Sequence, residues 1–236
     1  MDDGVTQLKV NPGKELSIIV ADQTYERWPI KTHVVTENDD IVLLVEEYVQ
    51  PYLQAGDFIF VSEKIVAISQ GRAFRIKDIQ PSRLANFLVR FVHKSPYGIG
   101  LGSPWTMELA LREAGVLRIL FAAFISAITK PFGLRGIFYH LAGKNVNAID
   151  GPCSYTLPPY NEYAKLGPLD PDGVAKRIKE RLGAEVVIID SNDLGVNVLG
   201  RSADFLTNDF CQKLFADNPL GQASEQTPIC LVRMRR

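Results

Sequence analysis

Two neighbouring oxygen-bearing side chains, Asp190 and Ser191, stand at the end of the run 185–190, which is the most β-branched stretch of the sequence. Such a run is typical of a buried strand. A carboxylate and a hydroxyl side by side offer the hard oxygen ligands that Mg²⁺ and Mn²⁺ prefer. Because mixed sheets present ligand-binding groups at the carboxyl ends of strands, this pair is the best metal candidate in the sequence, although a single acid does not make a site.

Asp150 is a second aspartate that ends an apolar stretch, and a turn at Gly151 and Pro152 follows it. Two carboxylates at two such ends could converge on one cation. For either aspartate taken alone, the alternative is a local role in which the carboxylate only caps its turn. Asp150, Asp190 and Ser191 are therefore the candidate metal ligands, with the turn-capping role as the alternative for each aspartate.

The segment from Gly56 to Arg72 carries a further group of polar residues, because an apolar strand there leads to a polar cluster and a Gly-Arg turn. Lys64 and Arg72 are the cationic side chains of this segment. Cationic side chains form strong charge-assisted hydrogen bonds with phosphate. We therefore expect Lys64 and Arg72 to contact an anion.

Cys153 offers a different kind of chemistry. A thiol becomes a nucleophile when a base approaches it, and pairing with His140 would define a cysteine-dependent transferase. The alternative is a buried structural thiol. Since the three cysteines form no Cys-x-x-Cys pair, the sequence predicts neither a disulfide framework nor a structural zinc site.

The composition is that of an ordinary globular protein, with a net charge of -1 over 236 residues. Lysines and arginines are scattered among acids, so there is no basic stripe for nucleic acid and a small-molecule partner is expected. The first residues are acidic and lack the basic and apolar regions of a signal peptide. We therefore expect a cytoplasmic protein.

The run 116–129 is the most apolar segment, and Arg118 interrupts it before Lys130 and Pro131 end it. It is shorter than the ~20 residues that a membrane span needs. We therefore expect no membrane contact and predict a buried helix. A dimer interface is the alternative, because a helix that is apolar on most sides must be covered by something.

The other elements alternate irregularly along the chain. Ser103 and Asp170 each precede a proline and are suited to begin a helix, and Gly115 and Gly183 are suited to end one. The irregular order predicts an α+β fold with mixed sheets, in a single domain over 1–236 that can hold two interleaved subdomains. Strands are predicted at 16–21, 57–61, 73–76, 185–190 and 228–233, and helices at 40–49, 82–92, 104–113, 174–182 and 203–216.

Short motifs form a wider pattern, which consists of 29–32 (PIKT), 39–41 (DDI), 56–72, Asp150, 169–172 (LDPD) and 190–191 (DS). Together they resemble the coenzyme F-420 γ-glutamyl ligase family, and the resemblance covers most of the chain. Members of that family join L-glutamate to the phospholactyl end of the coenzyme precursor in F-420 biosynthesis. The resemblance implies a mixed α and β fold that forms an intertwined homodimer.

The resemblance also implies an acyl-phosphate route, in which GTP activates a carboxylate and the amine of an amino acid then displaces phosphate. Asp150, Asp190 and Ser191 stand at the positions that bind metal in the family, so Mg²⁺ or Mn²⁺ is the implied cofactor. Cations that bridge phosphate oxygens neutralise the charge that develops during transfer. The implied function is a nucleotide- and metal-dependent amide ligase, and the choice between GTP and ATP stays open.

This sequence departs from the family at positions that contact the nucleotide or follow the metal motifs. Cys153 replaces an asparagine, Ile68 a lysine and Gln70 a glutamate, and Pro152 stands in place of a serine. The residues 192–195 replace the family's Gly-Arg-Pro. The loss of charged side chains around the phosphates weakens the electrostatic stabilisation of the transferred phosphoryl group. These departures motivate a second hypothesis, a non-catalytic ligand- or metal-binding protein on the same scaffold.

Overall fold

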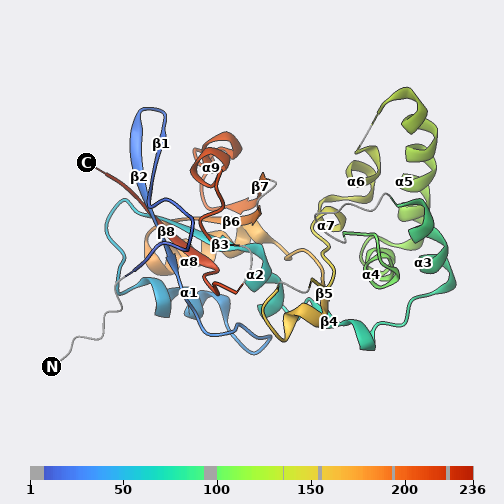
Figure 1. Cartoon of the computed structure of the whole chain (residues 1–236), viewed down its shortest axis with the longest axis horizontal. Helices are drawn as coiled ribbons and strands as arrows, with labels where there is room; N and C mark the ends of the chain where they lie inside the picture. The colour runs from blue at the N-terminus through green and yellow to red at the C-terminus, as the bar shows by residue number, and fades with distance from the viewer. Residues whose placement is uncertain are drawn as a thin grey trace. The chain divides into compact units, whose positions relative to one another are not determined.

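The computed structural model describes residues 8–92, 100–134, 136–153, 156–192, 195–221 and 224–235. The chain forms two compact units. The first unit contains Met1–Gln70 and Leu169–Arg236, and the second contains Gly71–Pro168. The second unit is therefore inserted into the first along the chain (Figure 1). Each unit has a hydrophobic core of its own.

A mixed sheet of six strands forms the centre of the first unit. In spatial order its strands are β1 (Ser17–Val20), β2 (Gln23–Ile30), β8 (Ile229–Met234), β3 (Phe58–Ser62), β6 (Glu185–Asn192) and β7 (Gly195–Arg201). β3 and β6 are parallel, and the other neighbouring strands are antiparallel. The predicted α+β fold with a mixed sheet is confirmed.

Helices cover both faces of this sheet (Figure 1). α9 (Asn208–Leu214) packs on the face that carries Phe60. On the other side, α8 (Pro171–Leu182) contacts β6 and β7, and α1 (Ile41–Val49) packs against α8. α2 (Glu63–Ser69) follows β3 directly. Because β3 and β6 are covered on both faces, their central residues are fully buried and almost continuously apolar.

The helices of the first unit begin and end at residues that satisfy their free backbone groups. Asp40 begins α1, because its Oδ1 accepts hydrogen bonds from the backbone nitrogens of Val42 (2.8 Å) and Leu43 (3.2 Å). Asp170 begins α8 in the same way, and Gly183 ends it with a φ of 73°. Such caps stabilise helices by pairing amides and carbonyls that have no partner within the helix.

Gly200 in β7 allows the start of α8 to approach the sheet closely. A Cβ atom at this position would lie 2.3 Å from the carbonyl carbon of Pro171 and 2.6 Å from the nitrogen of Asp172. The backbone nitrogen of Arg201 donates to Asp172 Oδ1 at 2.9 Å, which fixes the same contact. Since both obstructing atoms belong to the backbone, no side chain can move away to make room.

We expect Gly200→Ala to lower the free energy of unfolding of the first unit by about 2–3 kcal/mol, because α8 must shift to accept the extra carbon. Urea denaturation followed by circular dichroism measures this loss. Asn197→Ala, at an exposed position of the same strand, is the matched control. An unchanged unfolding midpoint for Gly200→Ala would show that the α8 contact is looser than described.

An ion pair between a buried arginine and a partly exposed aspartate joins β2 to the segment after α9. The side chain of Arg27 is 1% exposed and is paired with Asp217. Arg27 Nη2 donates to Asp217 Oδ2 at 3.0 Å, and Nη1 donates to the carbonyl of Leu214 at 2.9 Å. Burial by itself raises the pKa of Asp217, but the hydrogen bond and charge of Arg27 outweigh it and hold this pKa below its ordinary value.

The lowered pKa of Asp217 predicts a loss of stability in acid. The contribution of this carboxylate is fully present above the ordinary aspartate pKa and is lost as the pH falls through the lowered folded-state pKa. We therefore expect the free energy of unfolding to fall below about pH 4. Urea denaturation between pH 6 and 3 should show a weaker pH dependence for Asp217→Asn, with Asp22→Asn at an exposed position as the control. Identical profiles for the two variants would contradict this assignment.

The second unit is mainly helical (Figure 1). Its small sheet pairs β4 (Ala73–Arg75) with β5 (Tyr163–Lys165) in antiparallel orientation. The core includes Leu101, Met107 and Ile119. The helices are α3 (Arg83–Leu88), α4 (Pro104–Ala114), α5 (Val116–Thr129), α6 (Ile137–Ala142) and α7 (Lys144–Asn147), with short 3₁₀ turns η1 (Ile76–Asp78), η2 (Val89–Phe91), η3 (Lys130–Phe132) and, between α7 and β5, η4 (Tyr160–Glu162).

Two predictions for helices differ from the structure. The helix predicted at 203–216 is the shorter α9, because Thr207 caps its start through a hydrogen bond from Phe210 N to Oγ1 at 3.3 Å. α5 forms where the run 116–129 predicts a helix, but only Ile119 and Ala122 of it are buried. The prediction that this helix is buried is therefore wrong. Among the described helices, none has the length and apolar character needed to cross a membrane.

Candidate functional site

Asp190 and Ser191 lie near the end of β6, which continues to Asn192, beyond the predicted strand 185–190, and pairs with β7 over these residues. Asp190 is opposite Asn197, and Ser191 is opposite Val196. Both side chains are partly buried. Ser191 Oγ is buried and has no hydrogen-bond partner among the residues that the structure describes. A buried hydroxyl that makes no hydrogen bond is costly, so this atom is suited to a ligand.

The oxygen atoms of Asp190 and Ser191 are of the kind that binds a divalent cation, but these two side chains alone are too few to complete its coordination. Asp190 continues the face of Ile188 and Ser191 that of Ile189, because successive side chains of a strand point to opposite faces. In the extended β6 strand the two oxygens therefore lie on opposite faces of the sheet, and a cation could be held by both only if this part of the strand changed its conformation. No group of three His, Cys, Asp or Glu residues suited to a metal occurs in the described part of the chain. Water or substrate oxygens would have to complete the coordination.

Asp150 is paired with a buried lysine of the second unit. Its Oδ2 lies 3.5 Å from Lys165 Nζ, and the Lys165 side chain is 3% exposed whereas that of Asp150 is 32% exposed. The two residues also exchange backbone hydrogen bonds, at 3.0 Å from Asp150 N and at 2.8 Å from Lys165 N. An ammonium this close repels a second cation, so the surroundings of Asp150 fit a metal less well than its sequence motif predicts.

The three predicted metal ligands do not all belong to one unit. Asp190 and Ser191 are adjacent in the first unit, and Asp150 lies in the second. Whether Asp150 shares a cation with the other two stays a prediction. Sequence reasoning missed Lys165, and the only signal for it is a single lysine between the apolar residues Ala164 and Leu166.

Lys64 and Arg72, the predicted anion contacts, also belong to different units. Lys64 lies half-buried in the first turn of α2, which Ser62 caps. Arg72 is almost buried in the second unit and forms an ion pair with Glu113, at 2.7 Å between Nη2 and Oε1. Its Nε donates to the carbonyl of Gly167 at 2.6 Å. An anion at Arg72 would therefore have to compete with a carboxylate that is already in place.

Cys153 is half-buried, and its carbonyl accepts a hydrogen bond from the backbone nitrogen of Thr156 at 3.0 Å. His140 is exposed on α6. Among the contacts of the described residues, none joins the thiol to this imidazole. The structure therefore adds no geometric support for a cysteine nucleophile activated by His140.

The positions that lost the family's charged residues have structural roles here. Ile68 is 6% exposed and packs inside the first unit on α2. The side-chain amide of Gln70 donates to the carbonyl of Leu169 (2.9 Å) and accepts from the nitrogen of Leu169 (2.7 Å). Gln70 and Leu169 are the residues at which the chain leaves and re-enters the first unit. A glutamate at position 70 could accept from Leu169 but could not donate to it.

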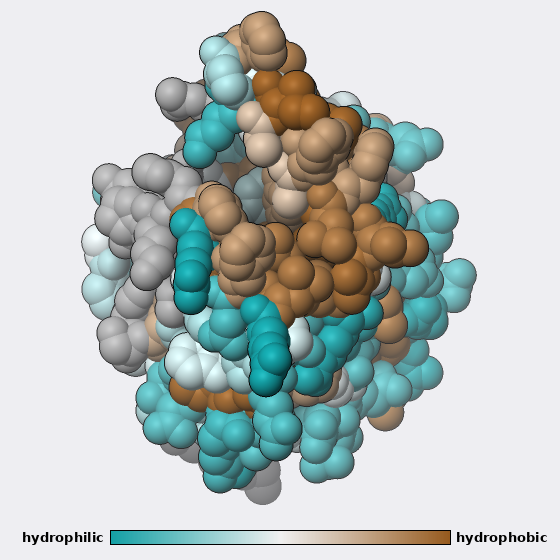
Figure 2. Space-filling model, turned by 90° about the vertical axis from the view of Figure 1, so that its right-hand side faces the viewer, coloured by the Kyte–Doolittle hydropathy of each residue, from teal (hydrophilic) through white to brown (hydrophobic). Residues whose placement is uncertain are grey.

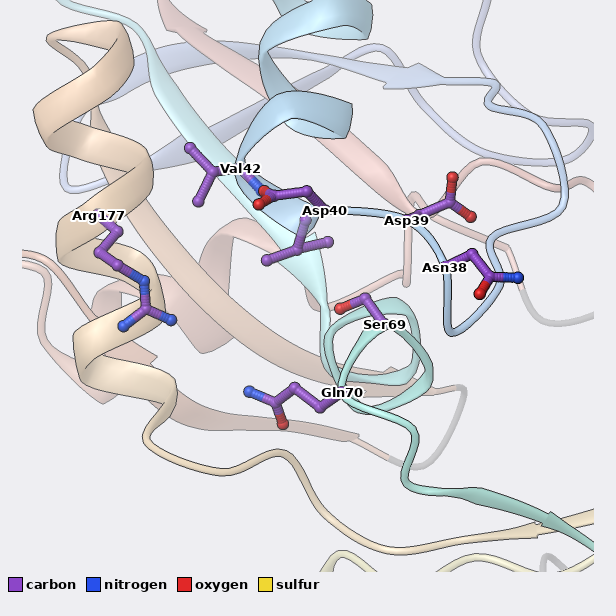
Figure 3. Close-up of a pocket in the computed structure, with 8 residues that line it drawn as sticks. Asn38, Asp39, Asp40, Val42, Ser69, Gln70 and Arg177 are labelled. Carbon is purple, nitrogen blue, oxygen red and sulfur yellow. The ribbon is translucent and has the colours of Figure 1, made fainter.

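An open cavity of about 360 Å³ lies in the first unit, where the start of α1, the end of α2 and one side of α8 meet (Figure 3). It does not contain the end of β6. We regard it as a shallow binding surface, because its wall is polar and it opens widely to solvent. The lining residues are Asn38, Asp39, Asp40, Ile41, Val42, Ser69, Gln70 and Arg177.

The cavity presents both signs of charge. Asp40 stands at the start of α1, and Arg177 reaches from α8 with its side chain 54% exposed (Figure 3). Asp39 accepts from the backbone nitrogen of Thr36 at 2.6 Å. Burial raises the pKa of Asp39, but hydrogen bonds from Thr36 and the nearby His33 outweigh it and lower this pKa below its ordinary value. A small polar molecule that carries both charges, such as an amino acid, matches this lining.

A comparison with curated protein sequences found no match. A comparison with protein-family models confirms the resemblance that the motifs indicate. The family model for F420-0:gamma-glutamyl ligase matches residues 29–198, which are most of the 236-residue chain. This match includes Asp150, Asp190 and Ser191. The chain therefore belongs to the F420-0:gamma-glutamyl ligase family.

Proposed function

We propose that this protein is a nucleotide- and divalent-metal-dependent ligase that joins an amino acid to a carboxylate through an acyl phosphate. The observation that carries the proposal is the family match over residues 29–198. The position of Asp190 next to Ser191, whose buried hydroxyl has no hydrogen-bond partner among the described residues, supports it. F-420 biosynthesis is the process that the family name supports.

The chemistry that a bound Mg²⁺ or Mn²⁺ supplies is neutralisation of the triphosphate charge. Asp190 and Ser191 would hold this cation, and Lys64 would contact a phosphate of GTP or ATP. The γ-phosphoryl group passes to the carboxylate oxygen and the nucleoside diphosphate leaves. The amine then attacks the acyl carbon, loses a proton, and displaces inorganic phosphate as the amide forms.

The cavity lined by Asp40 and Arg177 is our proposed position for the amino acid. The guanidinium of Arg177 would pair with the substrate's carboxylate, and Asp40 would accept from its ammonium group. Ion pairs of this kind orient a small zwitterion even where the cavity is open. We also propose a homodimer as the working form, since the family resemblance implies it, and light scattering after gel filtration measures the oligomeric state.

Calorimetric titration with GTP, and separately with ATP, tests the proposal in the presence and absence of Mn²⁺. We expect saturable binding that depends on Mn²⁺. Asp190→Asn should weaken it by roughly tenfold or more, because a charged oxygen ligand becomes neutral. Asp209→Asn, which changes an exposed acid that is paired with Lys213 on α9, is the matched control.

No binding of either nucleotide by the folded protein would contradict the ligase proposal and favour the second candidate. This alternative is a ligand- or metal-binding protein without catalysis on the same scaffold. It is favoured by the burial of Ile68 and by the hydrogen bonds that commit the amide of Gln70 to Leu169. Mn²⁺ binding without nucleotide binding is the result that this alternative predicts.

A further inference from the structure

The outward side of α5 in the second unit is apolar. The side chains of Leu117, Phe124 and Phe132 are 84%, 63% and 79% exposed. Figure 2 shows a broad hydrophobic area on this side of the molecule. We call this surface the α5 face, and it consists of Leu117, Leu120, Phe121, Phe124 and Ile128 together with Phe132 and Leu134 beyond the helix.

The α5 face reverses the usual pattern of a surface helix. Leu117, Phe121, Phe124 and Ile128 recur at helical spacing and form one exposed stripe along α5. A helix at the surface of a globular protein normally turns its charged and polar side chains to water. Contiguous apolar surface of this kind marks a site where another molecule covers the protein.

The charge of the surrounding segment identifies the kind of partner. No aspartate or glutamate occurs between Glu113 and Asp150, whereas the cations of this stretch are Arg118, Lys130, Arg135 and Lys144. Lys130 is exposed at the end of α5. The exposed Arg118 is held beside the end of α6, because its Nε donates to the carbonyl of Leu141 at 2.9 Å. An apolar surface on a segment whose charged residues are all positive is complementary to a membrane that contains anionic lipids.

A second copy of the chain matches this surface less well. If two α5 faces packed together, cations at the ends of both helices would come close. Between Glu113 and Asp150 there is no acid to pair with them. Like charges brought together at an interface oppose association. Charge complementarity therefore favours an anionic bilayer over self-association.

The length of α5 determines how it would meet the bilayer. It has 14 residues and so extends about 21 Å. The hydrocarbon core of a bilayer is about 30 Å thick, so this helix is too short to span it. A helix lying in the plane of the membrane needs no such length. The prediction of no membrane contact was based only on the length that a membrane-spanning helix needs, so it does not bear on a helix that lies in the membrane plane.

We propose that the α5 face docks in the plane of a bilayer that contains anionic lipids. Phe121, Phe124 and Phe132 enter the boundary between headgroups and acyl chains, and Lys130 contacts the headgroup phosphates. This binding is independent of the proposed ligase activity, because it uses no residue of the cation site or of the cavity.

Flotation of the full-length protein with vesicles tests this inference. We expect the protein to float with vesicles of phosphatidylcholine and phosphatidylglycerol, but weakly or not at all with phosphatidylcholine alone. The double substitution Phe121→Ser and Phe124→Ser should reduce the bound fraction by roughly tenfold or more, since it removes two inserted rings. Lys130→Glu should reduce binding only to the anionic vesicles. Ile19→Ser with Leu43→Ser, at exposed apolar positions of the first unit, is the control that should keep binding.

Fluorescence gives a second readout, because a Phe124→Trp variant should shift its emission to shorter wavelength when anionic vesicles are added. Circular dichroism confirms that each variant is folded. No flotation of the folded wild-type protein with anionic vesicles would overturn the inference. The inference would also be overturned if the Phe121 and Phe124 substitutions left vesicle binding unchanged. A dimer that these substitutions convert to a monomer, without vesicle binding, would assign the α5 face to a second copy.

Discussion

Asp150→Asn is expected to lower the free energy of unfolding of the second unit by about 3 kcal/mol, because it removes the carboxylate that lies 3.5 Å from the ammonium of Lys165. The Lys165 side chain is 3% exposed, so its charge cannot recover hydration. We take the lower end of the usual range for a broken buried pair, since Asp150 itself is 32% exposed. Urea denaturation followed by circular dichroism measures the loss.

The opposite substitution, Lys165→Met, is expected to cost less than about 1 kcal/mol. Methionine keeps an unbranched side chain in the buried space without carrying a charge. The Asp150 carboxylate remains in contact with water, so it can be solvated without the lysine. The double variant should therefore be closer in stability to wild type than Asp150→Asn alone. If Asp150→Asn and Lys165→Met lowered the free energy of unfolding equally, the buried lysine would not depend on its partner more than the partly exposed aspartate does.

This asymmetry determines how a metal-binding experiment at Asp150 must be designed. A loss of Mn²⁺ binding in Asp150→Asn could reflect unfolding as well as a missing ligand. Lys165→Met separates the two, because it removes a repelling charge and leaves the carboxylate in place. If Asp150 is a metal ligand, this variant should bind Mn²⁺ more tightly than wild type in calorimetry. Unchanged binding would limit the cation site to Asp190 and Ser191.

Local sequence signals predicted the ends of helices well. Ser103, Pro104 and Gly115 predict the limits of α4, and the structure places a capping box between Ser103 and Thr106 at its start. Gly115 ends the helix with a φ of 84°, a conformation that other residues rarely adopt. These signals depend on neighbouring residues only, which is why they can be read from a single sequence.

The errors arise where burial or helix type depends on distant residues. α2 was not predicted, because its apolar residues follow β3 without a break and a short apolar run does not distinguish a helix from a strand. α5 was predicted to be buried from its composition alone. An apolar composition indicates that a helix favours burial, but it does not show whether residues of the same chain pack against the helix.

In the candidate site, too, the features that depend on neighbouring residues were predicted, and the contacts between residues far apart in sequence were not. Asp190 and Ser191 were found because they follow a β-branched run, but β6 continues past them to Asn192, where it still pairs with β7. The ion pair of Asp150 with Lys165 was not foreseen, since it joins two segments through an isolated bridge. The pairing of Arg72 with Glu113 likewise joins residues far apart in sequence. Neither partner carries a local pattern that could reveal it.

A second large effect on stability is expected in the first unit, at Asp57. This side chain is 0% exposed, and Arg233 of β8 pairs with both of its oxygens at 2.7 Å. Asp57 Oδ2 also accepts from the backbone nitrogen of Gln54 at 2.8 Å. Arg233 donates to the carbonyl of Tyr52 at 2.9 Å and lies 5.0 Å from the centre of the Trp28 ring. These contacts attach the loop before β3 to two other strands.

Asp57→Asn should lower the free energy of unfolding of the first unit by about 3 kcal/mol, because the amide offers one acceptor in place of two charged ones. Arg233 is 26% exposed and regains some hydration, which keeps the loss at the lower end of the range. Asp22→Asn, at an exposed turn position, is the control and should leave stability unchanged. Differential scanning calorimetry and urea denaturation both measure the change.

A double-mutant cycle separates the pair from the other contacts of each residue. With Asp57→Asn and Arg233→Met combined, the loss should be smaller than the sum of the two single losses, since the second substitution removes a charge that has already lost its partner. Additive losses would mean that the hydrogen bonds to Gln54 and Tyr52 stabilise this corner, and that the ion pair does not. Because the residues of this pair lie outside both the end of β6 and the cavity lining, nucleotide binding at temperatures where the variants are folded should be unchanged.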